Sequence, residues 1–324
     1  MAKVHDRGGR LDAGPINRAE HVYTFWEKKA DAIAQLMGQK KLRRVDEMRR
    51  TLEAMEPDQY ERLSYYDRWL VATESLLVEK GMLTSMEIDE RLQASPLPPR
   101  RERARVREPG HDGHDHEHLP GDDRLELSPS EQRLDAIAEV LIDMGVLTAG
   151  EIRRQMEDMD SRTPAQGARV VARAWVDPAF RQRLLTDAKA ACAELGVDAS
   201  SIAELVALEN TDKVHHMVVC TLCSCYPRPV LGLPPDWYKS LAYRSRAVVE
   251  PRSVLHEFGL DLPDNVEVRV VDSTADTRFL VLPARPAGTE GMSERELAEL
   301  VTRDCMIGTA VPRAVPLPQA GEAR

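Results

Sequence analysis

Three of the five cysteines in this sequence lie within six residues, at Cys220, Cys223 and Cys225. Two valines precede the cluster and a Pro-x-Pro segment follows it, so we expect a buried strand that ends in a rigid loop carrying three thiols. In a reducing compartment such a cluster is more typical of metal binding than of disulfide formation. The alternative is a buried group of thiols that binds nothing.

The spacing of the cysteines also indicates the kind of metal site. A structural zinc site normally has four ligands in two separated pairs. Here a second pair is missing, because Cys192 and Cys305 stand alone in helical-looking sequence. Thiolates at positions i, i+3 and i+5 of a tight loop would bring backbone nitrogens within reach of the same ion. Such a soft-liganded metal would keep a position open for substrate or water.

The sequence around the cysteines resembles the metal loop of the nitrile hydratase α subunit, and of the related thiocyanate hydrolase γ subunit. The resemblance starts with Cys-Thr-Leu-Cys-Ser-Cys-Tyr at 220–226 and continues through residues 227–239, 285–291 and 301–308. In that family Thr221 and Tyr226 mark the cobalt form, whereas iron enzymes usually have serine and threonine there. The resemblance therefore implies one cobalt ion (Co³⁺) per chain.

The same resemblance implies a ligand set and a chemistry. Cys220, Cys223 and Cys225 would bind cobalt through sulfur, and the backbone nitrogens of Ser224 and Cys225 would complete the basal ligands. The family oxidises the second and third cysteines, which implies sulfinate at Cys223 and sulfenate at Cys225. Sulfinate is normally an irreversible product, so it would arise here by maturation. The sulfenate oxygen of Cys225 is then a candidate nucleophile or base toward a nitrile carbon.

Residues 1–95 carry a second resemblance, to the N-terminal helical half of the nitrile hydratase β subunit. The matching segments include Gly14-Pro-Ile-Asn-Arg18, Phe25-Trp-Glu27, Asp46-Glu-Met-Arg49 and Tyr65-Tyr-x-x-Trp69. In the family, two β arginines donate charge-assisted hydrogen bonds to the oxidised cysteines, and Arg49 matches the first. Tyr65 matches a tyrosine that reaches the active-site serine, here Ser224. Without the resemblance, Arg49 would be a solvated side chain and Tyr65 a core residue.

The second family arginine lies in the C-terminal half of the β subunit, a small β barrel in the family, and this sequence lacks a matching segment. The resemblance therefore implies a separate partner chain that carries the barrel. Thiocyanate hydrolase also divides its β-like part between two chains. A cobalt-delivery activator is a further expected partner.

Arg228 bears most directly on the substrate. Most nitrile hydratases carry tryptophan at this position, whereas thiocyanate hydrolase carries arginine. A cation beside Tyr226 at the mouth of a pocket would favour a small anion; the alternative is that Arg228 caps a loop or binds the partner. We expect hydration of a C≡N bond, from nitrile to amide. The first alternative is hydrolysis of thiocyanate to carbonyl sulfide and ammonia, and the second is a non-catalytic cobalt carrier or maturation protein.

Residues 96–128 are rich in proline, arginine and histidine and predict a flexible linker, because this composition cannot bury a core. The linker contains His111, His114, His116 and His118, interleaved with acidic residues. Such a tract can bind divalent cobalt, nickel or zinc loosely. A metal-acquiring tether and a plain solvated linker are both consistent with it.

The predicted fold is α+β, with an N-terminal helical domain at 1–95 that starts in an extended arm. After the linker, we expect a nitrile hydratase α-like domain at 129–315, made of a helical arm and αββα-type layers with the cysteine loop at a strand end, and a disordered tail at 316–324. In the α-like domain, patterning predicts helices near 179–195, 198–208 and 292–304, and strands at 214–220, 266–271 and 278–282.

A weak internal repeat relates residues 76–88 to residues 140–152. Each copy predicts a helix that ends at a glycine, Gly81 or Gly145, followed by a Thr-x-x-Glu capping box that opens a second helix. Two such hairpins suggest two pieces that pack against each other.

Composition excludes several classes of protein. A formal net charge of −10 argues against nucleic acid as the main partner, because phosphate binding needs a basic face. The first twenty residues contain no apolar core of a signal peptide, and no apolar run reaches the roughly 18 residues of a membrane span. We therefore expect a cytoplasmic protein.

Overall fold

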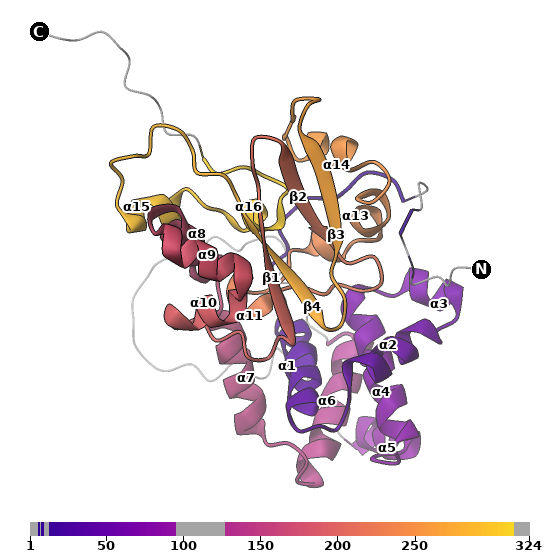
Figure 1. The fold of residues 1–324 in the computed structure, drawn as a ribbon. Coiled ribbons are helices and arrows are strands. Elements are labelled where there is room, and N and C mark those ends of the chain that lie inside the picture. Colours follow the sequence, from indigo (N-terminus) through magenta and orange to yellow (C-terminus); the bar gives the residue numbers. More distant parts are fainter. Residues whose placement is uncertain (1–5, 7, 10–12, 95–126, 314–324) are drawn as a thin grey trace, which may run out of the picture. The chain divides into compact units, whose positions relative to one another are not determined.

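The computed structural model describes residues 6, 8–9, 13–94 and 127–313. The chain divides into two compact units, one of residues 1–22 and 157–324 and the other of residues 23–156. We call the first the loop unit, because it contains the cysteines at 220–225, and the second the helical unit (Figure 1). Residues 96–126 of the predicted linker, its four histidines and the predicted tail at 316–324 lie outside the described residues.

The described residues of the helical unit form helices joined by short turns. These are α1 (Phe25–Gln39), α2 (Val45–Glu53), α3 (Pro57–Arg62), α4 (Tyr65–Glu79), α5 (Ser85–Ala94), α6 (Pro129–Asp143) and the first part of α7 (Ala149–Ser161). Apolar residues at helical spacing form the core, where Ile33, Met37 and Leu77 are fully buried. Pro57 occupies the first turn of α3, where its missing N–H costs no hydrogen bond.

Both copies of the internal repeat form the predicted helical hairpins. Gly81 and Gly145 follow the C-caps of α4 and α6 with φ of +64° and +70°, a conformation that glycine adopts without steric cost. Thr84 and Thr148 then form capping boxes with Glu87 and Glu151. The hairpins contact each other through α4, α5 and α6, so the predicted packing is confirmed.

The loop unit is α+β, as predicted. Its helices are α8 (Pro164–Val176), α9 (Pro178–Thr186), α10 (Ala188–Glu194), α11 (Arg228–Leu231), α12 (Asp236–Lys239), α13 (Leu241–Arg246), α14 (Pro251–Glu257), α15 (Glu294–Glu299) and α16 (Arg303–Ile307). Its strands are β1 (Glu204–Glu209), β2 (Val214–Val219), β3 (Glu267–Asp272) and β4 (Thr277–Leu282). Figure 1 shows α8, α9 and α10 beside the strands.

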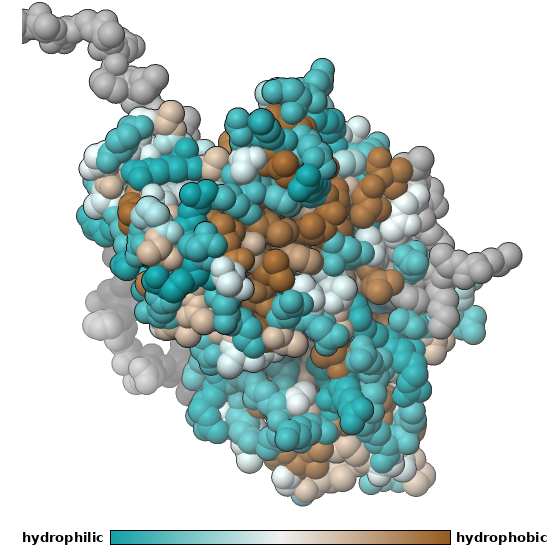
Figure 2. Space-filling view, in the orientation of Figure 1, coloured by the Kyte–Doolittle hydropathy of each residue, from teal (hydrophilic) through white to brown (hydrophobic). Residues whose placement is uncertain are grey.

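The strands form two parallel pairs, β1 with β4 and β2 with β3. In the second pair Val219 lies opposite Asp272, so the carboxyl ends of β2 and β3 lie at the same edge of this strand pair. Hydrophobic residues gather over the strands in Figure 2. Val268 and Val270 of β3 and Phe279 of β4 pack against the core and are only half-buried.

Three sequence predictions in this unit are wrong. The predicted helix near 179–195 is two helices, α9 and α10, separated at Asp187, which caps the second. Residues 198–208 do not form a helix, because 204–209 is strand β1. Its alanine, leucine and glutamate residues favour a helix, but pairing with β4 buries Leu205 and Ala207 on one face, and tertiary contacts override weak propensity. The predicted helix at 292–304 is two helices, α15 and α16, separated at 300–302, where Thr302 caps the second.

None of the helices among the described residues is long and apolar enough to cross a membrane.

Candidate metal centre

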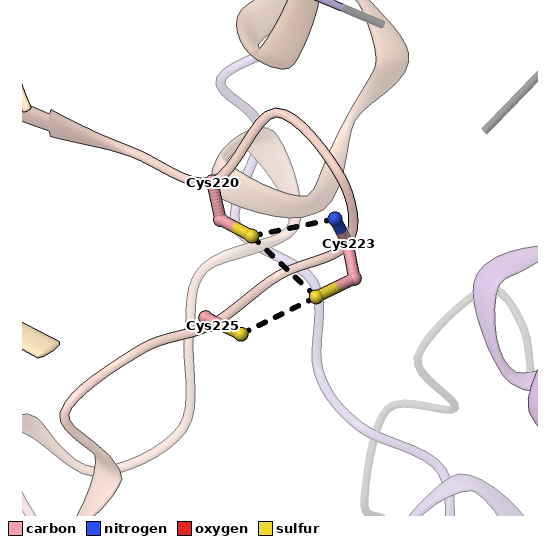
Figure 3. A group of neighbouring side chains, drawn as sticks. All are labelled: Cys220, Cys223 and Cys225. Atoms are coloured by element: carbon pink, nitrogen blue, oxygen red, sulfur yellow. Dashed lines mark hydrogen bonds between the residues drawn. The ribbon is translucent and has the colours of Figure 1, made fainter. Parts of the chain in front are cut away.

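The three cysteines lie at the carboxyl end of β2, in the loop that leads to α11. Their sulfur atoms are all within 4.8 Å of one another. Sγ of Cys223 lies 3.5 Å from Sγ of Cys220 and 3.3 Å from Sγ of Cys225, and the backbone N–H of Cys223 donates to Sγ of Cys220 at 3.3 Å (Figure 3). Cys220 and Cys225 are buried, whereas Cys223 is partly exposed. Three converging sulfurs on a tight loop form a donor set suited to a soft transition metal.

In the absence of a metal ion, the close approach of the three thiols disfavours their ionisation. The hydrogen bond with Cys223, together with burial, raises the pKa of Cys220 to about 11. The hydrogen bonds from Cys220 and Cys223, and then burial, raise the pKa of Cys225 far above its ordinary value. A bound cation reverses this balance, because a coordinating thiol is deprotonated. A metal ion that bound at this loop would therefore release protons.

The loop is supported by a carboxylate from the neighbouring strand. Asp272, the last residue of β3, accepts hydrogen bonds from the backbone N–H of Thr221 at 3.0 Å and from its Oγ1 at 2.5 Å. Arg244 on α13, which is buried, donates to the carbonyl of Thr221 at 2.8 Å. The conformation of the loop between Cys220 and Cys223 is thus fixed from both sides.

Two buried tyrosines hold the ends of the loop. Tyr243 donates to the carbonyl of Val218 at 2.6 Å, and Tyr238 donates to the carbonyl of Cys225 at 2.8 Å. Burial raises the pKa of both phenols well above the ordinary value, so both remain protonated donors. Polar groups buried in this way stabilise a single loop conformation once they are satisfied.

The structure brings the other predicted loop residues together with the cysteines. Ser224 and Tyr226 are buried, and the ring of Tyr226 meets that of Tyr238 edge-on, with 5.1 Å between centroids. Arg228, the first residue of α11, is half-buried, and its backbone N–H donates to the carbonyl of Tyr226 at 2.8 Å.

Arg49 and Tyr65 belong to the helical unit, on the neighbouring helices α2 and α4. Arg49 is largely buried, and its Nη1 lies 3.9 Å from a carboxylate oxygen of Asp46. Tyr65 packs against Tyr66 and Trp69, with ring centroids 5.0 and 5.5 Å away. The predicted accessory histidines, His111, His114, His116 and His118, lie outside the described residues.

Sequence reasoning missed the groups that support the loop. Asp272 and Arg244 lie 51 and 23 positions from Thr221, so no local motif connects them. Asp272 directly follows a run of β-branched residues, a pattern that places an acidic side chain at a strand end. The pattern does not show which segment of the chain that side chain contacts.

Two family models match this chain. Residues 128–310 match the nitrile hydratase alpha chain, and residues 1–114 match the N-terminal part of the nitrile hydratase beta subunit. The low-molecular-weight cobalt-containing nitrile hydratase subunit alpha of Rhodococcus rhodochrous is 55% identical over 56% of this chain and 87% of its own length. The chain belongs to the nitrile hydratase family.

Other members of the nitrile hydratase family match as well. The thiocyanate hydrolase subunit gamma of Thiobacillus thioparus is 44% identical over 55% of this chain and 78% of that subunit. A solved recombinant thiocyanate hydrolase with partially modified cobalt centres is 40% identical, with a TM-score of 0.56 over 61% of this chain and 99% of that one. The nitrile hydratase subunit beta of Pseudomonas putida is 37% identical over 27% of this chain, which spans 42% of that subunit. Nitrile hydratases and thiocyanate hydrolases are both enzymes, so this is an enzyme family.

Proposed function

We propose that this chain carries the cobalt centre of a nitrile hydratase-type enzyme, which hydrates a C≡N bond to an amide. The observation that carries the proposal is the convergence of the Cys220, Cys223 and Cys225 sulfurs in a loop with the family's cobalt-type residues. The three sulfurs and the backbone nitrogens of Ser224 and Cys225 would hold the ion. Bound there, cobalt would supply Lewis acidity toward a nitrile nitrogen or a water molecule.

The remaining roles belong to residues of this chain. Oxidation to sulfinate at Cys223 and sulfenate at Cys225 would place an oxygen at Cys225 that acts as nucleophile or base at the nitrile carbon. Ser224 lies between these residues, and Tyr65 is its proposed hydrogen-bond partner. Arg49 would stabilise the anionic sulfur–oxygen groups. The net reaction adds one water across C≡N and changes no oxidation state.

A separate chain carrying the C-terminal half of the beta subunit would complete the enzyme. Support comes from the beta relative, of which this chain spans 42%. The half-buried hydrophobic residues over the strands, among them Val268, Val270 and Phe279, offer that partner an apolar face (Figure 2). Large apolar patches on a soluble protein typically mark such interaction sites.

Thiocyanate is the second candidate substrate, and Arg228 is the observation that favours it. Arg228 is half-buried and lies two residues after Tyr226, and a guanidinium at this point of the loop would attract a small anion by focusing the local field. The higher identity to a nitrile hydratase alpha subunit, 55% against 44% for the thiocyanate hydrolase subunit, favours the nitrile.

The first experiment measures metal by elemental analysis, after co-expression with the barrel-carrying chain and a cobalt activator in cobalt-supplemented cells. We expect about one cobalt per chain, lost in Cys220→Ala and retained in Cys192→Ala. The second variant is a matched control, because Cys192 is a buried cysteine of α10 and does not belong to the group of sulfurs that converge at 220–225. Zinc in place of cobalt would indicate a metal carrier instead. The same conclusion would follow if cobalt persisted in Cys220→Ala but disappeared when residues 111–118 were deleted.

The second experiment offers the loaded complex a small nitrile and thiocyanate in parallel. Amide without carbonyl sulfide would reject the thiocyanate alternative, and carbonyl sulfide as the main product would reject the nitrile assignment. Arg228→Trp replaces the cation with an aromatic ring, and Arg228→Met removes the cation without adding a ring. If the guanidinium recruits an anion, both variants raise KM for thiocyanate while leaving cobalt content unchanged.

A further inference from the structure

Tyr238 of α12 and Tyr243 of α13 make the same kind of contact with the chain around the cysteine loop. Both side chains are fully buried, and each donates its hydroxyl to a backbone carbonyl. The oxygen–oxygen distances, 2.8 Å for Tyr238 and 2.6 Å for Tyr243, are typical of good hydrogen bonds. The two tyrosines differ in the residue whose carbonyl they bind.

The acceptor of Tyr238 is a proposed metal ligand, and the acceptor of Tyr243 is not. Tyr243 binds Val218, which lies in strand β2 before the first cysteine. Tyr238 binds Cys225, which would supply two donor atoms to the metal, its sulfur and its backbone nitrogen. Both atoms belong to one residue, so their directions depend on how the backbone of that residue is oriented. A hydrogen bond to its carbonyl restricts this orientation.

The ring of Tyr238 adds a second contact at the same point of the loop. It meets the ring of Tyr226 edge-on, with 5.1 Å between the centroids, an arrangement that aromatic pairs prefer. Tyr226 directly follows Cys225, so the hydroxyl and the ring of Tyr238 hold two consecutive residues. Asp272 holds Thr221 in the first half of the loop, and Tyr238 holds the second half.

Tyr238 is itself held in place by other aromatic side chains. The ring centroids of Trp237 and Tyr243 lie 6.0 and 5.7 Å from that of Tyr238. Trp237 in turn packs edge-on against Phe258, with centroids 4.7 Å apart. A ring enclosed in this way holds its hydroxyl at a defined position before any metal binds, which is what a preorganised site requires.

We propose that Tyr238 is a positioning residue of the metal centre, which sets the direction of the sulfur and the backbone nitrogen of Cys225. Removal of a group that orients metal ligands typically lowers metal affinity by about 10–100-fold. Tyr243 lacks this role, because its acceptor lies in β2, outside the loop. Because the metal centre is itself proposed, the role of Tyr238 rests on the proposed function, but it concerns the ligands and no step of the reaction.

The test compares Tyr238→Phe with Tyr243→Phe in the full chain, which is reduced, kept free of oxygen and titrated with Co²⁺. Each variant keeps the ring and leaves one carbonyl without its phenol donor, so both should lose similar stability in urea unfolding. Competition with a chelator measures the affinity for Co²⁺. The visible absorption bands of bound Co²⁺ report the arrangement of its donor atoms, because geometry is diagnostic of a metal site.

We expect Tyr238→Phe to bind Co²⁺ about 10–100-fold more weakly than the parent chain and to shift the absorption bands. Tyr243→Phe should keep the bands and the affinity of the parent. Parent-like bands and affinity in Tyr238→Phe, or the same shift in both variants, would overturn the proposal while the metal centre stands. A parent chain that binds no Co²⁺ would overturn the metal centre itself, and the role of Tyr238 with it.

A second substitution covers the case in which Tyr238→Phe does not fold, as judged by circular dichroism. Replacement of Tyr238 by fluorotyrosine keeps the ring and the hydroxyl but makes the phenol a stronger hydrogen-bond donor. We expect this change to move the Co²⁺ bands relative to the parent, and the same replacement of Tyr243 to leave them in place. Identical bands in all three proteins would show that Tyr238 does not position the ligands.

Discussion

The carboxylate of Asp272 accepts two hydrogen bonds from Thr221, one from the backbone N–H and one from the hydroxyl, and so connects the end of β3 to the cysteine loop. Asp272→Ala leaves both donors without this acceptor. We expect a lower cobalt content and a loss of about 1–3 kcal/mol in the free energy of unfolding, measured by elemental analysis and urea denaturation. The matched control is Glu267→Ala, an exposed carboxylate at the other end of the same strand. Equal losses in both variants would refute a specific role for Asp272.

Gly308 should tolerate no side chain, because its φ is +86° and a Cβ would lie 1.9 Å from the carbonyl oxygen of His216. Left-handed backbone costs an ordinary residue about 1–2 kcal/mol, and overpacking adds about 1–3 kcal/mol. Gly308→Ala is expected to lower the free energy of unfolding by at least about 2 kcal/mol. Gly291→Ala, with open space around its Cβ, should change it little; similar values for both would contradict this account.

His215 predicts a dependence of stability on pH. Its Nε2–H donates to the carbonyl of Gly308 at 2.7 Å, and its Nδ1 faces the amide of Asn210 at 3.1 Å. Burial lowers the pKa of His215 below the ordinary value of about 6.5. The folded state therefore binds fewer protons than the unfolded state, so stability is complete above about pH 6.5 and falls as the pH drops below it.

The measurement is urea unfolding between about pH 5 and 8. His215→Gln should flatten the change below pH 6.5 relative to the parent chain. Burial and Arg269 also lower the pKa of His216, so part of the slope should remain. Asp261 raises the pKa of the exposed His256, so His256→Gln should not flatten the slope. An unchanged slope in His215→Gln would show that this histidine is not responsible.

Cobalt should stabilise the folded chain, because a ligand that binds only the native state shifts unfolding by about 2.7 kcal/mol at a hundredfold excess over Kd. We expect the melting temperature of the loaded protein to exceed that of protein prepared without cobalt. The difference should vanish in Cys220→Ala and persist in Cys192→Ala. A cobalt-dependent shift of the same size in Cys220→Ala would place the binding site elsewhere.

Short sequence motifs correctly predicted the elements whose structure depends on neighbouring residues. The capping boxes at Thr84 and Thr148, and the glycines that precede them, fix helix ends through neighbouring residues. The strands at 214–219 and 267–272 are rich in β-branched residues and were found in the same way. The spacing of the cysteines likewise indicated a shared site.

The features that the sequence did not predict depend on contacts between residues that lie far apart in the chain. Strand β1 is made of Glu-Leu-Val-Ala-Leu-Glu, and only its pairing with β4, about 70 positions later, makes it extended. Asp272 and Arg244 support Thr221 from other elements of the loop unit. Pattern and propensity carry no information on such pairings, which tertiary packing selects.

The parallel pairing of β2 with β3 also sets the order in which the site can form. Parallel strands require a long crossover, and here the crossover contains the cysteine loop and α11 to α14. On the ribosome, the thiols emerge well before Asp272, the residue 51 positions later that supports their loop. Pairing at such long sequence separation is slow. A nascent chain therefore presents three unsupported thiols, and the supported loop exists only after synthesis has passed the end of β3.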